Sequence, residues 1–302
     1  MSIKSVLKRA RVSQPFNNLA TSLLKSTGVR SEVVTKHLPR VGVTKVKLPN
    51  GKVLKLESEV AHWIPNQLFW HGWLGYEPEV TPIFYKLAKR ASVVLDVGAH
   101  FGFFTILAAL ANPRAKVIAM EPLQRVFERL QQNVELNGLT NVECQRAAAS
   151  STEGVAEFFF PDENAPVSSS LRSDFLVATI PEDKLLKVEV PVVTLDRIAE
   201  ERDFATVDLI KLDTERTEHE VLAGSRSILE RFRPDIICEV WPDAANAEVL
   251  EEILKPLGYN FYHLLPEGPF LRQRIIPSVD SLNYLFTLSE LCDSAVNLNA
   301  TQ

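Results

Sequence analysis

The residues best suited to chemistry in this sequence are carboxylates that follow short apolar runs. Asp213 and Glu215 come directly after the run 207–212, and Glu239 lies at the end of the run 235–240. If these runs are parallel strands, their carboxyl ends share one edge of a sheet, where such folds bind ligands. A carboxylate there can accept a proton from a hydroxyl group or orient it. Asp213 is the first candidate for this role, with Glu215 and Glu239 next. The alternative for Asp213 is a structural cap on the helix that follows.

A glycine-containing turn lies upstream of these acids. The sequence D-V-G-A-H-F-G occupies residues 96–102, between an apolar run at 93–97 and a helical pattern at 103–111. Its glycines permit a tight turn in which backbone N–H groups approach a ligand. The spacing is G-x-x-x-G, whereas a dinucleotide fingerprint is G-x-G-x-x-G, so a dehydrogenase is a poor match. The plain alternative is a strand-to-helix turn without a ligand.

Glu121 follows the next apolar run, 116–120, at a distance from the glycine turn that suits one β-α-β unit. An acid at this position can accept hydrogen bonds from both hydroxyls of a ribose. The alternative is an acid favoured only by the dipole at the start of a helix. The glycine turn and Glu121 together predict a nucleoside site.

The elements that must position these residues form an alternating pattern of short β-branched runs and amphipathic helical stretches. This pattern predicts a mostly parallel sheet that is covered by helices on both faces. The expected strands are 93–97, 116–120, 142–146, 157–160, 187–193, 207–212, 235–240, 259–265 and 284–288. The expected helices are 81–90, 103–111, 123–136, 218–231 and 244–257.

The first 80 residues differ in character from the rest and are expected to form a basic, aromatic accessory segment before a domain at 81–295. Residues 1–55 carry 12 Lys or Arg and one acid. We expect amphipathic helices within 1–30, a hairpin at 43–56, and a packed loop or short helices at 61–79. A basic arm can touch a membrane surface, nucleic acid or an acidic partner, or it can be solvated or docked on its own acidic domain. We expect no nucleic-acid partner and leave peripheral membrane contact open.

Targeting signals and metal-binding cysteine patterns are not evident in the sequence. No apolar run reaches the length of a membrane-spanning helix, and no signal-peptide core follows the basic N-terminus, so we expect a cytoplasmic protein. Cys144, Cys238 and Cys292 form no C-x-x-C pair, which argues against a zinc site or a disulfide framework. Cys238 is expected to be a buried, inert thiol. A divalent metal held by several of the acids is the less favoured alternative, and no metal site is expected.

These motifs resemble the FkbM family of S-adenosylmethionine (SAM) dependent methyltransferases, and the resemblance covers roughly residues 70–290. The family's D-x-G-A-x-x-G is present at 96–102, and its E-P is Glu121-Pro122. The block 208–239 is the most specific part of the resemblance. Further matching segments are Ser169-Ser170-Leu171, 190–196 and 221–224.

The resemblance implies a fold, a cofactor and a reaction. The fold is the Rossmann-like class I methyltransferase fold of the α/β class, with a seven-stranded, mostly parallel sheet that contains one antiparallel strand. The cofactor is SAM, and the reaction is O-methylation of a hydroxyl on a small molecule or glycan. The catalytic set is Asp213, Glu215 and Glu239. The expected cofactor-binding residues are Asp96, Gly98, Ala99, His100, Gly102, Glu121, Pro122 and Ala148.

One position departs from the family, which usually has glycine where this chain has Arg216. If that position needs a positive φ, arginine is strained there. Alternatively, Arg216 reaches an anionic group of the substrate, or the turn tolerates any residue. The departure keeps open a non-catalytic module that only binds the nucleoside. A nicotinamide-dependent oxidoreductase is the third and least favoured hypothesis. The serine-containing loop 168–170 is interpreted either as a mobile lid or as an unstructured surface loop.

Overall fold

The computed structural model describes residues 19, 21–23, 25–26, 41–58, 63–162, 169–172, 181, 184–242, 244–279 and 281–291. Most of the segment expected to form N-terminal helices, together with Ser168 and Cys292, lies outside the described residues. The chain divides into two compact units, Met1–Thr81 and Pro82–Gln302. No helix among the described residues combines the length and apolarity needed to cross a membrane.

The first unit contains the hairpin expected at 43–56, which is confirmed. Strands β1 (Gly42–Lys47) and β2 (Val53–Ser58) pair antiparallel. Gly51 turns the chain at φ 81°, a conformation that glycine adopts without steric cost. The aromatic segment that follows forms short helices, α4 (Trp63–His71) and the 3₁₀ helix η1 (Gly72–Leu74).

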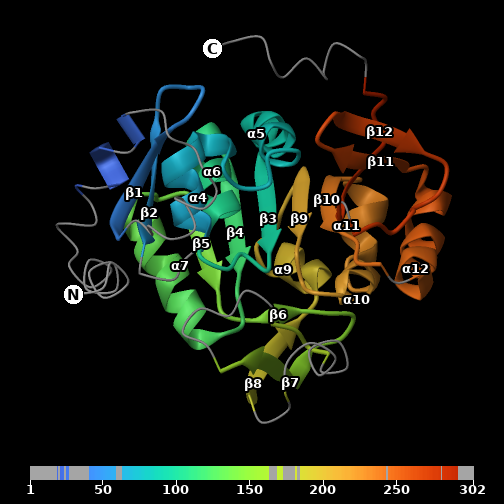
Figure 1. The fold of residues 1–302 in the computed structure, drawn as a ribbon. Coiled ribbons are helices and arrows are strands. Elements are labelled where there is room, and N and C mark those ends of the chain that lie inside the picture. Colours follow the sequence, from blue (N-terminus) through green and yellow to red (C-terminus); the bar gives the residue numbers. More distant parts are fainter. Residues whose placement is uncertain are drawn as a thin grey trace. The chain divides into compact units, whose positions relative to one another are not determined.

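The second unit is built on a mostly parallel sheet, as expected (Figure 1). Along the sheet the order is β12 (Gly268–Arg272), β11 (Asn260–Leu265), β13 (Asn283–Thr287), β10 (Asp235–Glu239), β9 (Leu209–Leu212), β3 (Val93–Val97), β4 (Lys116–Met120) and β5 (Val142–Gln145). Strands β5, β4, β3, β9 and β10 are parallel to one another, and β13 runs against both of its neighbours. The predicted fold class, with its reversed strand, is confirmed. Strand β12 adds an eighth strand at the edge, antiparallel to β11, which the sequence patterns did not predict.

Helices cover both faces of this sheet. They are α5 (Thr81–Arg90), α6 (Phe103–Ala111), α7 (Gln124–Leu136), α9 (Leu195–Glu201), α10 (Glu218–Ala223), α11 (Arg226–Arg231), α12 (Ala244–Leu254) and the 3₁₀ helix η3 (Lys255–Leu257). Apolar residues of α9 to α12 pack with alternate residues of β3, β4, β9 and β10 in one core cluster. Leu130 and Val134 of α7 pack on Ala119, which belongs to the opposite face of β4, and Thr105 of α6 bonds to Asp96 on that same face. All five residues of β3 are buried, which explains why its sequence is apolar apart from Asp96.

Two predicted elements are corrected. The single helix expected at 218–231 is two helices, α10 and α11, separated at Gly224 and Ser225. A Cβ on Gly224 would lie 2.1 Å from the carbonyl oxygen of Ser150. The helix therefore breaks where two backbone segments that are distant in the sequence approach each other closely. The strand expected from residue 207 begins at Leu209. Asp208 instead accepts hydrogen bonds from the backbone N–H groups of Ser92 and Val93.

A small second sheet lies at the carboxyl ends of the parallel strands (Figure 1). It consists of β6 (Ala148–Ala149), β8 (Leu185–Val193) and β7 (Gly154–Pro161), in the order β6-β8-β7. The added strands expected at 157–160 and 187–193 are therefore confirmed, and they pair antiparallel with each other. Cys238 is fully buried in β10, where burial raises the pKa of its thiol well above the usual range, as expected of an inert cysteine.

Candidate active site

The glycine turn between β3 and α6 brings two strand ends into backbone contact. Gly98 and Gly102 have φ values of 79° and 86°, which only glycine adopts readily. A Cβ on Gly98 would lie 1.8 Å from the carbonyl oxygen of Asp213, and Asp213 donates its backbone N–H to the carbonyl of Val97 at 3.0 Å. The cofactor-side turn and the first candidate catalytic acid are therefore in direct contact.

The backbone N–H groups of this turn are satisfied within the protein. Gly98 and Ala99 both donate to the carbonyl of Met120, at 3.0 and 2.9 Å, and Gly102 donates to Ala99 at 2.8 Å. The N–H of His100, a residue with φ 49°, donates to a carboxylate oxygen of Glu121 at 3.2 Å. Three of these groups hold the turn against the end of β4 and the fourth closes the turn on itself, whereas the sequence suggested that the turn's N–H groups would face a ligand.

Glu121 is a buried carboxylate at the end of β4, with 7% of its surface exposed. Its second oxygen accepts a hydrogen bond from the N–H of Leu123 at 2.9 Å. A carboxylate has about four acceptor positions, so each oxygen retains capacity for a ligand hydroxyl. Burial raises the pKa of Glu121 to about 7, against the opposing effect of these hydrogen bonds.

The other cofactor-side residues lie around the same strand ends. Asp96 is buried in β3 and accepts a hydrogen bond from the hydroxyl of Thr105 at 2.5 Å, and burial raises the pKa of Asp96 to about 6. Pro122 lines a cavity of about 340 Å³ together with Leu123 and Phe160. Ala148 is buried in a cluster that also contains Leu123.

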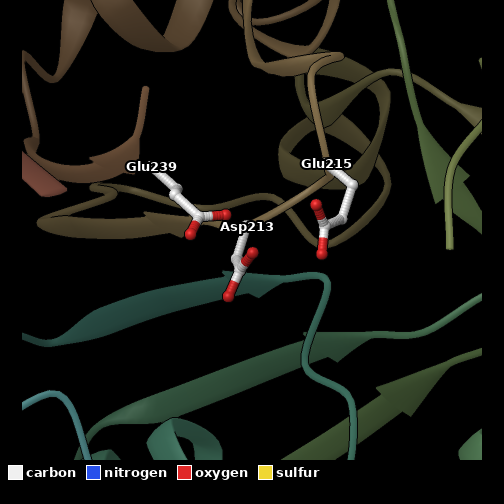
Figure 2. Close-up of side chains that lie close together, drawn as sticks. All are labelled: Asp213, Glu215 and Glu239. Carbon is white, nitrogen blue, oxygen red and sulfur yellow. The ribbon is translucent and has the colours of Figure 1, made fainter. Parts of the chain in front are cut away.

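The three candidate catalytic acids converge. Asp213 directly follows β9, Glu215 lies two residues later in the turn, and Glu239 ends β10. Figure 2 shows their carboxylates pointing toward one another, and one oxygen from each lies within 4.8 Å of the others. All three side chains are half-buried. The predicted meeting of these acids at one sheet edge is therefore what the geometry gives.

Crowding of like charges away from water makes two of these acids hard to ionise. Burial, followed by the charges of Asp213 and Glu218, raises the pKa of Glu215 to about 9. Burial, followed by the charges of Asp213 and Glu215, raises the pKa of Glu239 well above its usual range. Burial and like charge therefore both oppose full ionisation of this cluster.

Two charged residues in this region were missed at the sequence level. Lys211 is only 1% exposed, and its ammonium lies 3.5 Å from an Asp213 oxygen and 5.1 Å from the centre of the Phe104 ring. Glu218 is fully buried, and one of its oxygens accepts hydrogen bonds from the N–H groups of Thr214 and Arg216. Glu218 therefore braces the turn, a role that the sequence interpretation had considered for Asp213. The sequence feature that could have identified Glu218 was its position as an acid in the first turn of a predicted helix.

Arg216, the residue that replaces the usual glycine, occupies a left-handed conformation with φ 79°. The preceding Glu215 has φ 55°. The Arg216 guanidinium lies 5.2 Å from the centre of the Trp241 ring, and the Trp241 indole N–H donates to Glu239 at 3.1 Å. The position is thus one that favours glycine, and here its side chain stacks on a residue that contacts the acid cluster.

Ser170 joins the small sheet to the acid cluster. It is fully buried, forms an antiparallel bridge with Phe159, and donates its hydroxyl to the carbonyl oxygen of Glu215 at 2.7 Å. This part of the serine segment is therefore docked and hydrogen-bonded, so the interpretation as an unstructured surface loop is wrong. His219 is half-buried, and its Nδ1 is buried without a hydrogen-bond partner in the described part of the chain.

Comparison with known proteins places this site in a family. The sequence model of the Methyltransferase FkbM domain matches residues 96–261, which is more than half of the chain. The chain belongs to the FkbM methyltransferase family. The matched range contains every residue predicted for the site of this FkbM methyltransferase, from Asp96 to Glu239. The family match favours methyl transfer over the oxidoreductase alternative.

Two curated proteins and one solved structure are similar to this chain. The FkbM methyltransferase described here is 29% identical over 206 residues to the 31-O-demethyl-FK506 methyltransferase FkbM of Streptomyces tacrolimicus, which covers 60% of this chain and 75% of that protein. It is 25% identical over 219 residues to Methyltransferase sdnD of Sordaria araneosa, covering 61% of this chain and 81% of that protein. The crystal structure of Methyltransferase FkbM from Methylobacillus flagellatus KT aligns with a TM-score of 0.46 and 15% identity, over 74% of this chain and 52% of that one.

Proposed function

We propose that this chain is a SAM-dependent O-methyltransferase that acts on a hydroxyl of a small molecule or glycan. The observation that carries the proposal is the contact between Gly98, in the cofactor-side turn, and Asp213, in a cluster of three acids. A cofactor held at the turn would present its reactive end to these carboxylates.

The chemistry of the turn fits SAM better than a dinucleotide. The N–H groups of Gly98, Ala99, His100 and Gly102 are already bonded within the protein, so they offer no cradle for a pyrophosphate. The carboxylates of Asp96, Glu121 and Asp213 interact with one another, and together they would repel phosphate. SAM carries no phosphate, and its sulfonium is a cation that an acidic site favours.

Each site residue has a role in this proposal. Glu121, with acceptor capacity to spare, would hold the ribose hydroxyls. SAM would supply an electrophilic methyl group when bound. Asp213 would accept the proton that the acceptor hydroxyl loses, and Glu215 and Glu239 would hold the acceptor oxygen in place. Positioning of the two reactants supplies much of the rate enhancement in a reaction of this kind.

The choice of oxygen as the acceptor atom rests on carboxylates that could take a hydroxyl proton and on the relatives. The Streptomyces tacrolimicus protein is, by its name, a methyltransferase that acts on 31-O-demethyl-FK506, which is methyl transfer to an oxygen. We extend to this chain the class of acceptor, a hydroxyl, and not that compound.

Calorimetric titration of the whole chain with SAM and with NAD tests the cofactor. We expect saturable binding of SAM alone, and binding of NAD alone would refute the proposal. Incubation with SAM and a panel of hydroxylated metabolites, followed by mass spectrometry, then tests turnover. If the chain binds SAM but transfers its methyl group neither to an acceptor nor, slowly, to water, the result would support the non-catalytic module instead.

Asp213→Asn separates chemistry from binding. We expect near-normal SAM affinity and a turnover reduced by about a hundredfold or more, because loss of a general base typically costs 10²–10⁴-fold. Melting temperature and single-turnover rate should be measured on the same preparation. Wild-type turnover per folded molecule in the variant would remove Asp213 from the catalytic set.

A further inference from the structure

The acid cluster continues sideways along the sheet into a third strand. The parallel pairing of β9 with β10 ends at Leu212 and Cys238, so the next residues along, Asp213 and Glu239, lie side by side. On the other side of β10, Glu239 pairs directly with Asn283 of the antiparallel strand β13. Directly opposed residues in a ladder project from the same face. Asp213, Glu239 and Asn283 therefore form a row on one face of the sheet.

Asn283 offers this row an oxygen that no described residue bonds to. The residue is 6% exposed, and its Oδ1 is buried without a hydrogen-bond partner among the described residues. One carboxylate oxygen of Glu215 is also buried, and no described residue forms a hydrogen bond with it. Buried acceptors without a donor or a cation are costly and uncommon in folded proteins, so each one calls for an explanation.

The charges around the row do not balance. Four carboxylates, those of Asp213, Glu215, Glu218 and Glu239, interact across this region. Two cationic side chains, Lys211 and Arg216, interact with the same group. By formal charge, the four acids outnumber the two cationic side chains by two, which is the charge of one divalent cation.

We propose that Asp213, Glu215 and Glu239 bind a divalent cation that prefers oxygen ligands, such as Mg²⁺ or Mn²⁺, with Oδ1 of Asn283 as a fourth oxygen. Carboxylate and carbonyl oxygens without any nitrogen or sulfur ligand suit these ions rather than Zn²⁺ or Cu²⁺. One oxygen from each acid already lies within 4.8 Å of the others, close enough for a single ion to contact all three after small side-chain rotations.

Such a cation would give the cluster a second chemical role besides holding the acceptor, the activation of the acceptor hydroxyl. An acceptor hydroxyl that completes the coordination would become more acidic, as bound water does at a metal. This step rests on the proposed O-methylation, whereas the cation site itself does not. The two proposals can therefore fail separately.

Binding of Mn²⁺ to the whole chain, after chelator treatment and without SAM, tests the site. Electron paramagnetic resonance of free Mn²⁺ in a titration should reveal one saturable site, which Mg²⁺ displaces. Glu239→Gln keeps the shape of the side chain and should weaken Mn²⁺ binding at least tenfold. Asn283→Ala, which removes only the proposed fourth oxygen, should weaken it by a smaller factor, about fivefold.

Glu200→Gln is the matched control, because Glu200 lies on α9 with its side chain 77% exposed and away from the row. It should bind Mn²⁺ like the wild type. Glu215→Gln serves as a second site variant in case Glu239→Gln does not fold by circular dichroism. No saturable binding in the wild type, or equal affinity in wild type and in the folded site variants, would overturn the cation site. Mn²⁺ binding without SAM binding would instead overturn the proposed cofactor and leave the cation site standing.

Discussion

At the scale of one residue, the buried carboxylate of Glu121 lowers the folding stability of the protein at neutral pH. Its carboxylate is buried, with the pKa raised to about 7, while the unfolded chain ionises near 4.5. The folded state therefore holds a proton that the unfolded state has already lost between these two values. Folding stability from this group is complete below about pH 4.5 and falls as the pH rises toward 7. Glu121 therefore costs stability at neutral pH, and its proposed role in binding ribose hydroxyls gives a reason for a buried carboxylate at this position.

Glu121→Gln should remove this pH dependence. Between pH 5 and pH 8, the wild type should lose roughly 2–3 kcal/mol more unfolding free energy than the variant, from the pKa difference alone. Urea unfolding at both pH values measures the effect without SAM. The substitution also has a cost that does not depend on pH, because the new side-chain amide group can face a backbone N–H. Comparing how the unfolding free energy changes with pH, rather than its absolute value, excludes this cost. Parallel slopes for the two proteins would mean that Glu121 is not a buried, proton-holding carboxylate.

Arg216 gives a second residue-scale prediction, because its backbone conformation and its side-chain stacking can be separated. Both Arg216→Ala and Arg216→Gly lose the contact with Trp241, but only glycine relieves the left-handed conformation at φ 79°. We expect the glycine variant to be more stable than the alanine variant by about 1 kcal/mol.

Gln132, exposed within helix α7, provides the control for this pair. There the order should reverse, with alanine more stable than glycine by about 0.5–1 kcal/mol. Chemical denaturation of Arg216→Ala, Arg216→Gly, Gln132→Ala and Gln132→Gly measures these differences in unfolding free energy. If Arg216→Ala were as stable as Arg216→Gly, the positive φ would not be the reason that the family favours glycine.

At the scale of elements, the sequence predicted what local patterns determine. Strand β3 is apolar except for Asp96 because both of its faces are buried, and the acids Asp213 and Glu239 were found because they lie at the ends of strands. The break in the helix at 218–231 could not be predicted, since it depends on the contact of Gly224 with Ser150, far away in the chain. The same holds for Asn283, whose significance comes from its pairing with Glu239 across two strands.

The contact between the ends of β3 and β9 yields a prediction at this scale. Gly98→Ala adds a methyl group where the carbonyl oxygen of Asp213 already lies, so the two strand ends must separate. We expect a loss of unfolding free energy of about 3 kcal/mol or more, from crowding and the positive φ together. SAM affinity should fall as well, because the turn and the acid cluster move apart.

Gly138→Ala is the matched control, since Gly138 also has a positive φ, 63°, but an added Cβ would meet nothing within 4 Å. Gly138→Ala should lose only the unfolding free energy that corresponds to backbone strain at a positive φ, about 1 kcal/mol. Its SAM affinity should be unchanged. Thermal unfolding and calorimetry on both variants measure the two effects. Equal losses in the two variants would show that the approach to Asp213 carries no extra energetic weight.

For the whole molecule, the main question is which part of the chain is needed for the proposed activity. Every residue assigned to the cofactor or the acids, from Asp96 to Glu239, belongs to the second compact unit, as does the Asn283 of the proposed cation site. The main sheet, its helices and the small sheet belong to that unit too. The first unit has its own hairpin, and the basic residues of 1–55 lie at its end of the chain. We therefore propose residues 1–80 as an accessory segment and 81–295 as the methyltransferase domain.

A shortened chain of residues 81–302 tests this division, because it begins where helix α5 begins and keeps that helix whole. A sheet with helices on both faces buries its apolar surface within the unit, so the fragment should fold with a single cooperative transition. SAM affinity should stay within about threefold of the full chain, since no SAM-side residue is removed; a threefold change is about 0.65 kcal/mol. Turnover of a hydroxyl acceptor may be compared in the same preparations, and a loss of turnover with SAM affinity retained would assign acceptor binding to residues 1–80. A fragment that fails to fold, or that folds but no longer binds SAM, would contradict the division, because the second unit would then depend on the first for its cofactor site.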